Sequence, residues 1–247
     1  MPASAPSFRP SHGFPAPLVR ATLLRRYKRF LADVRLEDGT ALTAHCPNPG
    51  SMMGLNTPGS EVWLSPARSP GRKLPYTLEL VRAGGLVGVN TGWPNTLAEE
   101  AIRSGRIPEL ADYETIRREV PYGKNSRIDL LLEGGGRPPC LVKVKNVHLR
   151  RGDGTLAEFP DCVTVRGAKH LVELQGMVAN GRRAVMLYIV QREDCDRFRL
   201  AADIDPAYTR AFAVARAGGV EALCYSCKVG PEAIELAGPL PIDEAKI

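Results

Sequence analysis

The sequence predicts a small β-barrel followed by an α/β domain built on a mixed sheet. Three observations support this fold class. The first part of the 247-residue chain consists of short segments separated by Pro and Gly, without helical periodicity. After residue 90 the pattern changes to helices that alternate with strands. The segment 184–191 is almost continuously apolar, which is typical of a strand that is covered on both faces.

The composition is that of a soluble globular protein, with 44% hydrophobic and 24% charged residues. No apolar run approaches the ~20 residues that a membrane span needs, so we expect no membrane contact and a cytoplasmic location. A net charge of +6 favours nucleic acid or another anionic partner. Residues 1–17 contain Pro, Ser and Ala without an apolar core, which predicts a disordered tail and not a signal peptide.

Residues 18–90 are predicted to form the barrel from about five strands. The opening segment, residues 19–35, has six basic side chains against Asp33 alone, and its end alternates like a strand with one solvated face. Asp38-Gly39 signals a hairpin turn. The remaining strands are expected at residues 40–45, 61–64, 76–82 and 86–90.

Basic and aromatic side chains coincide in the opening segment. This combination suits a groove in which arginines contact phosphates while aromatic rings stack on bases. The alternative is an ordinary barrel with a basic outer face. The loop that follows residue 45 adds a His and an Asn held by Pro and Gly. The candidate nucleic-acid contacts of this domain are Arg26, Tyr27, Arg29, Phe30, His45 and Asn48.

Residues 91–247 are predicted to form the second domain, with a boundary near residues 89–93. Thr96-Leu97-Ala98-Glu99 fits a capping box and predicts a helix from Thr96 to about Arg103, on which Glu100 shares the inward face with Leu97. The following elements are expected to be strands at 115–120, 127–133 and 140–147, a loop at 150–161, a helix at 164–179, the strand 184–191, a helix from Asp205-Pro206 to Gly218 and a strand at 220–229. The first six elements have the core order of restriction-endonuclease-like folds.

Residues 125–147 contain the most informative pattern in the chain. Two strands are joined by a Gly/Pro turn near Gly136, and antiparallel pairing about this turn places Asp129 opposite Lys143. Lys145 shares a strand face with Lys143. Many divalent-metal nucleases carry an Asp on the first such strand and Glu-x-Lys on the second. Here Lys143 occupies the Glu position, and a lysine cannot ligate Mg²⁺ through oxygen.

We therefore expect a nuclease-like site with an impaired metal centre. Asp129, Lys145 and Glu100 are its vestigial catalytic residues, and Asp129 and Glu100 are the candidate metal ligands. No cofactor is certain, with Mg²⁺ as the candidate. A second carboxylate that has moved to Glu119 or Glu173 would instead give a Mg²⁺-dependent nuclease. A protein-binding scaffold is the third alternative.

The helix at residues 164–179 begins with three basic side chains, Arg166, Lys169 and His170. Backbone N–H groups at a helix N-terminus favour anions, so this position suits a DNA phosphate. A solvated first turn is the alternative, although basic residues there oppose the helix dipole. Cys224-x-x-Cys227 lies inside an apparent strand without further ligands nearby, so we expect neither a zinc site nor a redox pair.

Ordered motifs run through both predicted domains: Leu24-x-Arg26-Tyr27-x-Arg29-Phe30-x-Ala32-Asp33, His45-Cys46-Pro47-Asn48-x-Gly50-x-Met52, Asn90-Thr91, Tyr122-Gly123, Ser126-Arg127-Ile128-Asp129, Val144-Lys145-Asn146-Val147, Phe159-Pro160-Asp161 and Arg166-Gly167-x-Lys169-His170-Leu171-x-Glu173-Leu174. In these motifs the chain resembles the sugar fermentation stimulation protein (SfsA) family. The resemblance implies an OB-like barrel, a nuclease-like domain of the PD-(D/E)xK type, DNA binding and a regulatory role in sugar metabolism. The family pattern has Glu-Val-Lys where this chain has Lys143-Val144-Lys145.

Overall fold

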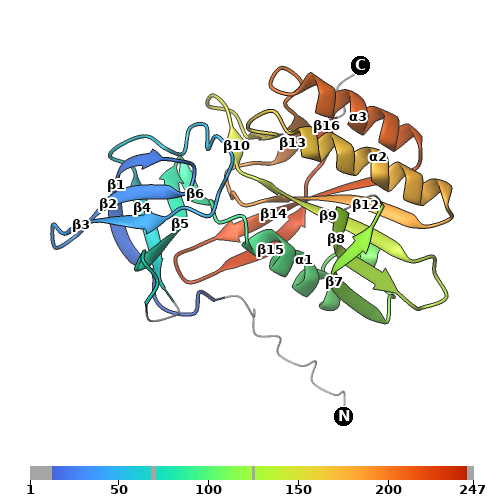
Figure 1. The fold of residues 1–247 in the computed structure, drawn as a ribbon, viewed down its shortest axis with the longest axis horizontal. Coiled ribbons are helices and arrows are strands. Elements are labelled where there is room, and N and C mark those ends of the chain that lie inside the picture. The colour runs from blue at the N-terminus through green and yellow to red at the C-terminus, as the bar shows by residue number, and fades with distance from the viewer. Residues whose placement is uncertain (1–12, 68–70, 124–125, 244–247) are drawn as a thin grey trace, which may run out of the picture.

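The structure, a computed structural model, describes residues 13–67, 71–123 and 126–243. A β-barrel precedes a mixed-sheet α/β domain, which confirms the predicted fold class (Figure 1). Most of the predicted disordered tail lies outside the described residues. Its last part is held in place, because Phe14 N–H donates to the Glu232 carbonyl at 3.0 Å and the Phe14 ring packs edge-on against Trp93. Within the described ranges, no helix is long and apolar enough to cross a membrane.

The barrel sheet has six strands in the order β3-β2-β1-β4-β5-β6, and pairing of β3 with β5 closes it. The predicted single segment 19–35 is two strands, because Lys28 and Arg29 adopt positive φ angles of 47° and 63° and reverse the chain. Buried apolar side chains such as Leu23 and Leu78 fill the interior. The strands are β1 (Val19–Tyr27), β2 (Leu31–Leu36), β3 (Ala41–His45), β4 (Glu61–Pro66), β5 (Tyr76–Ala83) and β6 (Gly85–Gly88).

The second domain is built on a six-stranded sheet with the order β15-β14-β12-β9-β8-β7. In it β9, β12 and β14 are parallel, and the remaining pairs are antiparallel. Its helices are α1 (Trp93–Arg103), α2 (Val165–Ala179) and α3 (Pro206–Ala217). Its strands are β7 (Thr115–Tyr122), β8 (Ser126–Glu133), β9 (Cys140–Val147), β12 (Arg183–Val190), β14 (Glu221–Val229) and β15 (Ile234–Pro239).

Two predicted elements of the second domain differ from the structure. The segment 150–161 is not a plain loop, because β10 (Leu149–Arg150) and β11 (Leu156–Phe159) pair with β13 (Arg197–Leu200) and β16 (Ile242–Asp243) in a small sheet. The first helix begins at Trp93, capped by Gly92 and with a proline in its first turn. The expected capping box at residues 96–99 therefore lies inside the helix. By contrast, Thr164 and Asp205 cap α2 and α3 through their side chains.

Side chains of β9 alternate between two hydrophobic cores. Val142 and Val144 belong to the core that α1 covers, whereas Leu141 belongs to the core that α2 and α3 cover. Lys143 and Lys145 alternate with the first pair and therefore face α2. Figure 1 shows α2 and α3 together on one side of the sheet and α1 on the other.

Candidate functional site

The centre of the candidate site is a buried ion pair between β8 and β9. Lys143 Nζ lies 2.9 Å from Asp129 Oδ1 and donates a second hydrogen bond, of 3.0 Å, to the Arg127 carbonyl. Asp129 Oδ2 accepts a hydrogen bond of 2.7 Å from the Val144 N–H. Both residues of the pair are buried. The structure thus confirms that Asp129 faces Lys143, and both Asp129 oxygens already accept hydrogen bonds.

The arrangement does not fit a divalent-metal centre. Among the residues that the structure describes, no group of three His, Cys, Asp or Glu side chains could hold a metal ion. Glu100, the second expected ligand, lies on α1 and so across the sheet from Asp129. Its expected metal-binding and catalytic roles are corrected here, since helical spacing shows which side of a helix faces inward but not which face of the sheet it covers. Glu119 is exposed on β7.

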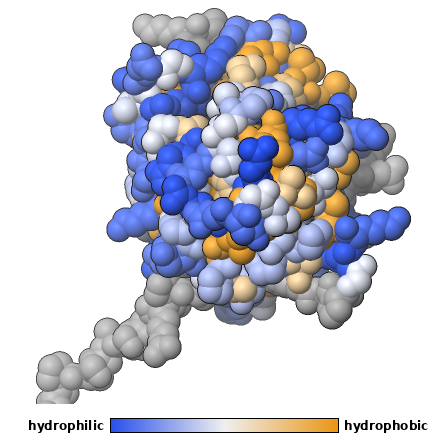
Figure 2. All heavy atoms as spheres, turned by 90° about the vertical axis from the view of Figure 1, so that its left-hand side faces the viewer, coloured by the Kyte–Doolittle hydropathy of each residue, from blue (hydrophilic) through white to orange (hydrophobic). Residues whose placement is uncertain are grey.

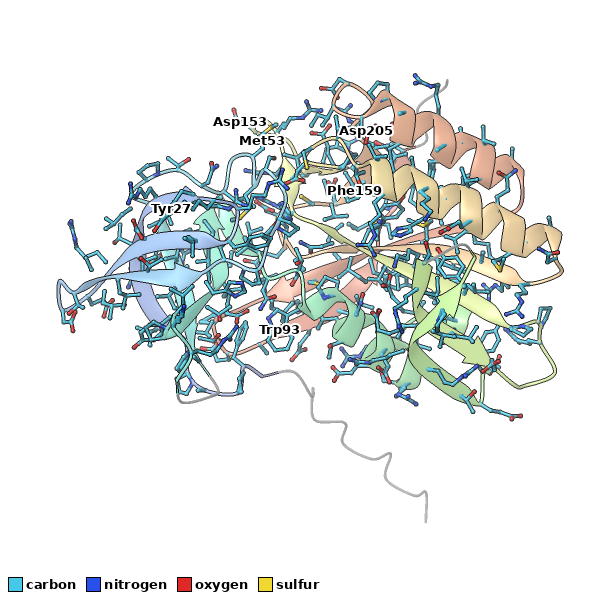
Figure 3. All side chains as sticks on the ribbon, in the orientation of Figure 1. Tyr27, Met53, Trp93, Asp153, Phe159 and Asp205 are labelled. Atoms are coloured by element: carbon cyan, nitrogen blue, oxygen red, sulfur yellow. The ribbon has the colours of Figure 1, made fainter. Side chains whose placement is uncertain are left out.

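Lys145 has different surroundings from Lys143. Its amine takes no part in a hydrogen bond or ion pair within the described ranges, and the centre of the Phe159 ring lies 6.0 Å from it. Figure 3 labels Phe159 near the N-terminal end of α2, close to Asp205. Desolvation by burial, followed by the charge of Lys143, lowers the pKa of Lys145 to about 8. A fraction of this amine is therefore unprotonated at neutral pH.

Three polar side chains on this side of the sheet have buried atoms without a hydrogen-bond partner in the described structure. These atoms are Tyr122 Oη, His170 Nδ1 and both carboxylate oxygens of Glu173. Glu173 also lies 3.5 Å from Lys169 Nζ. Burial and then the charge of Lys145 lower the pKa of His170 to about 3, so its imidazole is neutral. Burial and then the charge of Glu173 raise the pKa of Tyr122. Unsatisfied buried groups are rare in native proteins, so each of these atoms requires an explanation.

Two predicted nucleic-acid contacts of the barrel are turned inward. Asn48 is 1% exposed, its Nδ2 donates to the Val89 carbonyl at 3.0 Å, and its Oδ1 accepts from the Gly50 N–H at 2.9 Å. Arg26 donates to the carbonyls of Asn48 and Gly50 at 2.7 and 2.8 Å. Both side chains therefore shape the loop 46–52 instead of presenting themselves to a ligand, which corrects their expected direct role. Buried His170 is corrected in the same way.

The other predicted contacts of the barrel fall into two places. Arg29 and Phe30 lie in the exposed turn between β1 and β2, where Phe30 is 47% exposed. Tyr27 is half-buried behind them, with Arg25 stacked on its ring. His45 instead lines a separate cavity of about 420 Å³ beside Glu79. Figure 2 views the barrel end of the molecule and shows hydrophilic residues over most of that face.

The β1–β2 turn lies on the same side of the molecule as the N-terminal end of α2. Arg26 donates to the carbonyls of Arg29 and Ser51 at 2.9 and 3.3 Å, and Ser51 Oγ donates to the Asp161 carbonyl at 2.6 Å, so the turn lies near the segment that precedes α2. Arg166 and Lys169 on the first turns of α2 are exposed. We call these exposed basic residues of the two domains, Arg29, Arg166 and Lys169, the basic seam.

A network of buried polar side chains joins the two domains beside the basic seam. Asp161 Oδ2 accepts hydrogen bonds from Met52 N–H at 2.8 Å and His148 Nε2 at 3.1 Å. His148 Nδ1 in turn lies 2.9 Å from Asn146 Nδ2, and Asn146 Oδ1 accepts from Gln191 Nε2 at 2.6 Å. Burial raises the pKa of Asp161, but the hydrogen bonds from His148 and Met52 outweigh this and hold it low. Sequence reasoning missed this network, because residues that are hydrogen-bonded in it lie as far apart in the chain as Met52 and Asp161, 109 residues.

Asp161→Ala is expected to loosen the barrel loop at residues 46–52. The change leaves the Met52 N–H and His148 without their shared acceptor, which costs about 1–3 kcal/mol of unfolding free energy. Urea unfolding measures this loss, and faster hydrogen exchange at the Met52 amide localises it. Asp153→Ala, in an exposed turn, is the matched control. Unchanged exchange at Met52 would show that Asp161 does not hold the loop.

Two family models match this chain. The model described as the SfsA N-terminal OB domain matches residues 24–89, and the model described as the sugar fermentation stimulation protein RE domain matches residues 92–233. The meeting point of the two models falls between β6 and α1, where the barrel ends in the structure.

Curated relatives match over nearly the full chain. A sugar fermentation stimulation protein homolog of Paramagnetospirillum magneticum is 62% identical over 93% of this chain and 97% of its own length. A homolog of Rhodospirillum centenum is 64% identical over 90% of this chain and 95% of its own length. Among solved structures, Pyrococcus furiosus SfsA in complex with Ca²⁺ has a TM-score of 0.85 and 27% identity, and the match covers 96% of this chain and all of that one.

Proposed function

The chain belongs to the sugar fermentation stimulation protein family, and from this premise we propose that it is a DNA-binding protein whose nuclease-like domain has lost metal-dependent cleavage. A regulatory role in sugar metabolism and a cytoplasmic location are part of the proposal, and the family description supports the former. The observation that supports DNA binding is the basic seam, to which both domains contribute exposed cations. Arg29 comes from the barrel and Arg166 and Lys169 from α2.

The Lys143–Asp129 pair is the observation that supports the loss of metal-dependent cleavage. Mg²⁺ and Ca²⁺ prefer carboxylate and carbonyl oxygens, and a fixed ammonium group 2.9 Å from Asp129 Oδ1 competes directly with a cation for that oxygen. The solved relative binds Ca²⁺ according to its description. In this chain the ammonium of Lys143 occupies the space beside Asp129 Oδ1 that a cation would need.

DNA affinity is expected to fall linearly as the salt concentration rises on a double-logarithmic plot. Each phosphate contact contributes a slope of about −0.9, so Arg29→Gln and Arg166→Gln should each flatten the plot by about one unit. Fluorescence anisotropy of a labelled duplex measures the slope. Arg182→Gln, an exposed arginine that follows the opposite end of α2, is the matched control and should leave it unchanged. Affinity that does not depend on salt would contradict the proposal.

One observation favours a second candidate function, a Mg²⁺-dependent nuclease with a moved carboxylate. The Glu173 carboxylate is buried without a hydrogen bond on the same side of the sheet as Asp129. Supercoiled DNA incubated with the native chain in Mg²⁺ or Mn²⁺ separates the two functions. Cleavage that disappears in both Asp129→Ala and Glu173→Gln would establish the nuclease and overturn the loss of metal-dependent chemistry.

A further inference from the structure

The replacement of a carboxylate by Lys143 changes the chemistry that Lys145 can perform. Lys143 is paired with Asp129 and held by the Arg127 carbonyl, whereas the Lys145 side chain is half-buried and its amine has no acceptor among the described residues. A desolvated lysine next to another cationic group is the arrangement that activates amines as nucleophiles toward carbonyl carbons. In agreement with this geometry, the pKa of Lys145 is lowered to about 8.

We propose that Lys145 forms an imine with the open-chain deoxyribose aldehyde at an abasic position in DNA, and that the site then cleaves the strand by β-elimination without a metal. This inference rests on the proposed DNA binding, because the basic seam beside Lys145 selects an aldehyde that is flanked by phosphates. Arg166 is near enough to influence the pKa of Lys145. A free aldehyde would lack the phosphates that this seam recognises.

The site contains the groups that each step requires. The lone pair of Lys145 Nζ attacks C1′ of the aldehyde, and loss of one water gives the protonated imine. The Glu173 carboxylate, which accepts no hydrogen bond and lies 3.5 Å from Lys169 Nζ, takes the proton from C2′. The electron pair of that C–H bond forms the C2′=C3′ double bond, and the C3′–O3′ bond breaks to release a strand with a 5′-phosphate. Water then hydrolyses the imine, so Lys145 is regenerated and no oxidant or reductant is consumed.

The polar groups on this side of the sheet suit this sequence of proton transfers. His170 is neutral, and its Nδ1 has no partner in the described residues, so it offers a second acceptor. Tyr122 Oη also lacks a partner and can donate to the oxygen of the carbinolamine as water leaves. None of these roles needs the carboxylate of Asp129, which remains engaged with Lys143.

Borohydride trapping on a duplex with one abasic position tests the proposal. Reduction of the imine joins Lys145 to the DNA through a secondary amine, which a denaturing gel detects as a protein–DNA band. We expect the initial trapping rate to fall at least tenfold in Lys145→Arg, which keeps the charge but is too basic to form an imine. Lys228→Arg, an exposed lysine on β14, is the control and should trap like the native chain. Glu173→Gln should still be trapped but should cleave more slowly.

Two further arms separate this inference from the proposed DNA binding. A duplex with a tetrahydrofuran analogue lacks the aldehyde and should bind equally well without being trapped. If the native chain binds DNA but is not trapped, or if Lys145→Arg is trapped at the native rate, imine formation at Lys145 is excluded while DNA binding stands. If no duplex binds, the proposed function itself fails.

Discussion

Lys143→Glu is expected to create a divalent-metal site that the native chain lacks. The change removes the ammonium from Asp129 Oδ1 and places a second carboxylate on the β9 face that points to α2. Two carboxylates side by side repel each other when buried, and a divalent cation relieves this repulsion. Titration calorimetry should therefore show Mg²⁺ or Ca²⁺ binding in the variant and negligible heat in the native chain. At a metal concentration of 100 Kd, the variant should gain about 2.7 kcal/mol of stability.

Lys143→Gln is the matched control for this result, because it removes the same charge without adding a carboxylate. It should show no metal binding. Lys145→Ala in the Lys143→Glu background should keep the metal but lose any cleavage, since Lys145 is the cation left to stabilise charge at the phosphate. Metal binding by the native chain that disappears in Asp129→Ala would contradict the interpretation of the Lys143–Asp129 pair.

The β8–β9 hairpin shows what a sequence can establish about a site. The bounds of β9 follow from side-chain alternation between a Gly/Pro turn and a polar segment, and the structure places the strand at the predicted residues, Cys140–Val147. The pairing of Asp129 with Lys143 follows from counting outward from the turn, and the ion pair confirms it. Counting residues outward from the turn works because the turn fixes the register of the two antiparallel strands.

Glu100 and Arg26 show where this reasoning fails. Helical spacing predicts that Glu100 lies on the inward side of α1. It does not indicate which face of the sheet α1 covers, and that face decides whether Glu100 can approach Asp129. A basic residue beside aromatic ones predicts a solvated contact surface. Arg26, however, turns back onto the carbonyls of its own loop. A local sequence pattern does not show whether such a side chain points into solvent or back onto its own loop.

The hydrogen-bond network around Asp161 is visible only in the tertiary structure. The sequence does not indicate a partner for His148, which meets Asp161 through its Nε2 atom at 3.1 Å. The orphaned atoms of Tyr122 and Glu173 are likewise visible only when burial is known. The sequence feature that points to this site is the pair of lysines on one face of the strand 140–147, because lysines are unusual in the core of a protein.

Asp129→Ala is expected to be among the most destabilising single changes in the second domain. It leaves the buried Lys143 ammonium with the Arg127 carbonyl and removes the acceptor of the Val144 N–H. Breaking a buried ion pair from one side costs about 3–5 kcal/mol, because the remaining charge has no compensating partner. The midpoint of urea unfolding measures this loss, provided that the dependence on urea concentration stays unchanged.

A double-mutant cycle with Lys143→Met separates the cost of an unpaired charge from the cost of lost packing. Removing both partners leaves no buried charge, so the double variant should be more stable than Asp129→Ala alone, and the two effects should not add. Asp196→Ala, which removes a carboxylate that is 68% exposed, is the matched control and should change stability by less than about 0.5 kcal/mol. If Asp129→Ala proves equally mild, or if the two changes add, the pair does not balance a buried charge. Another group would then have to balance the charge of Lys143, and the lowered pKa of Lys145 would need a different explanation.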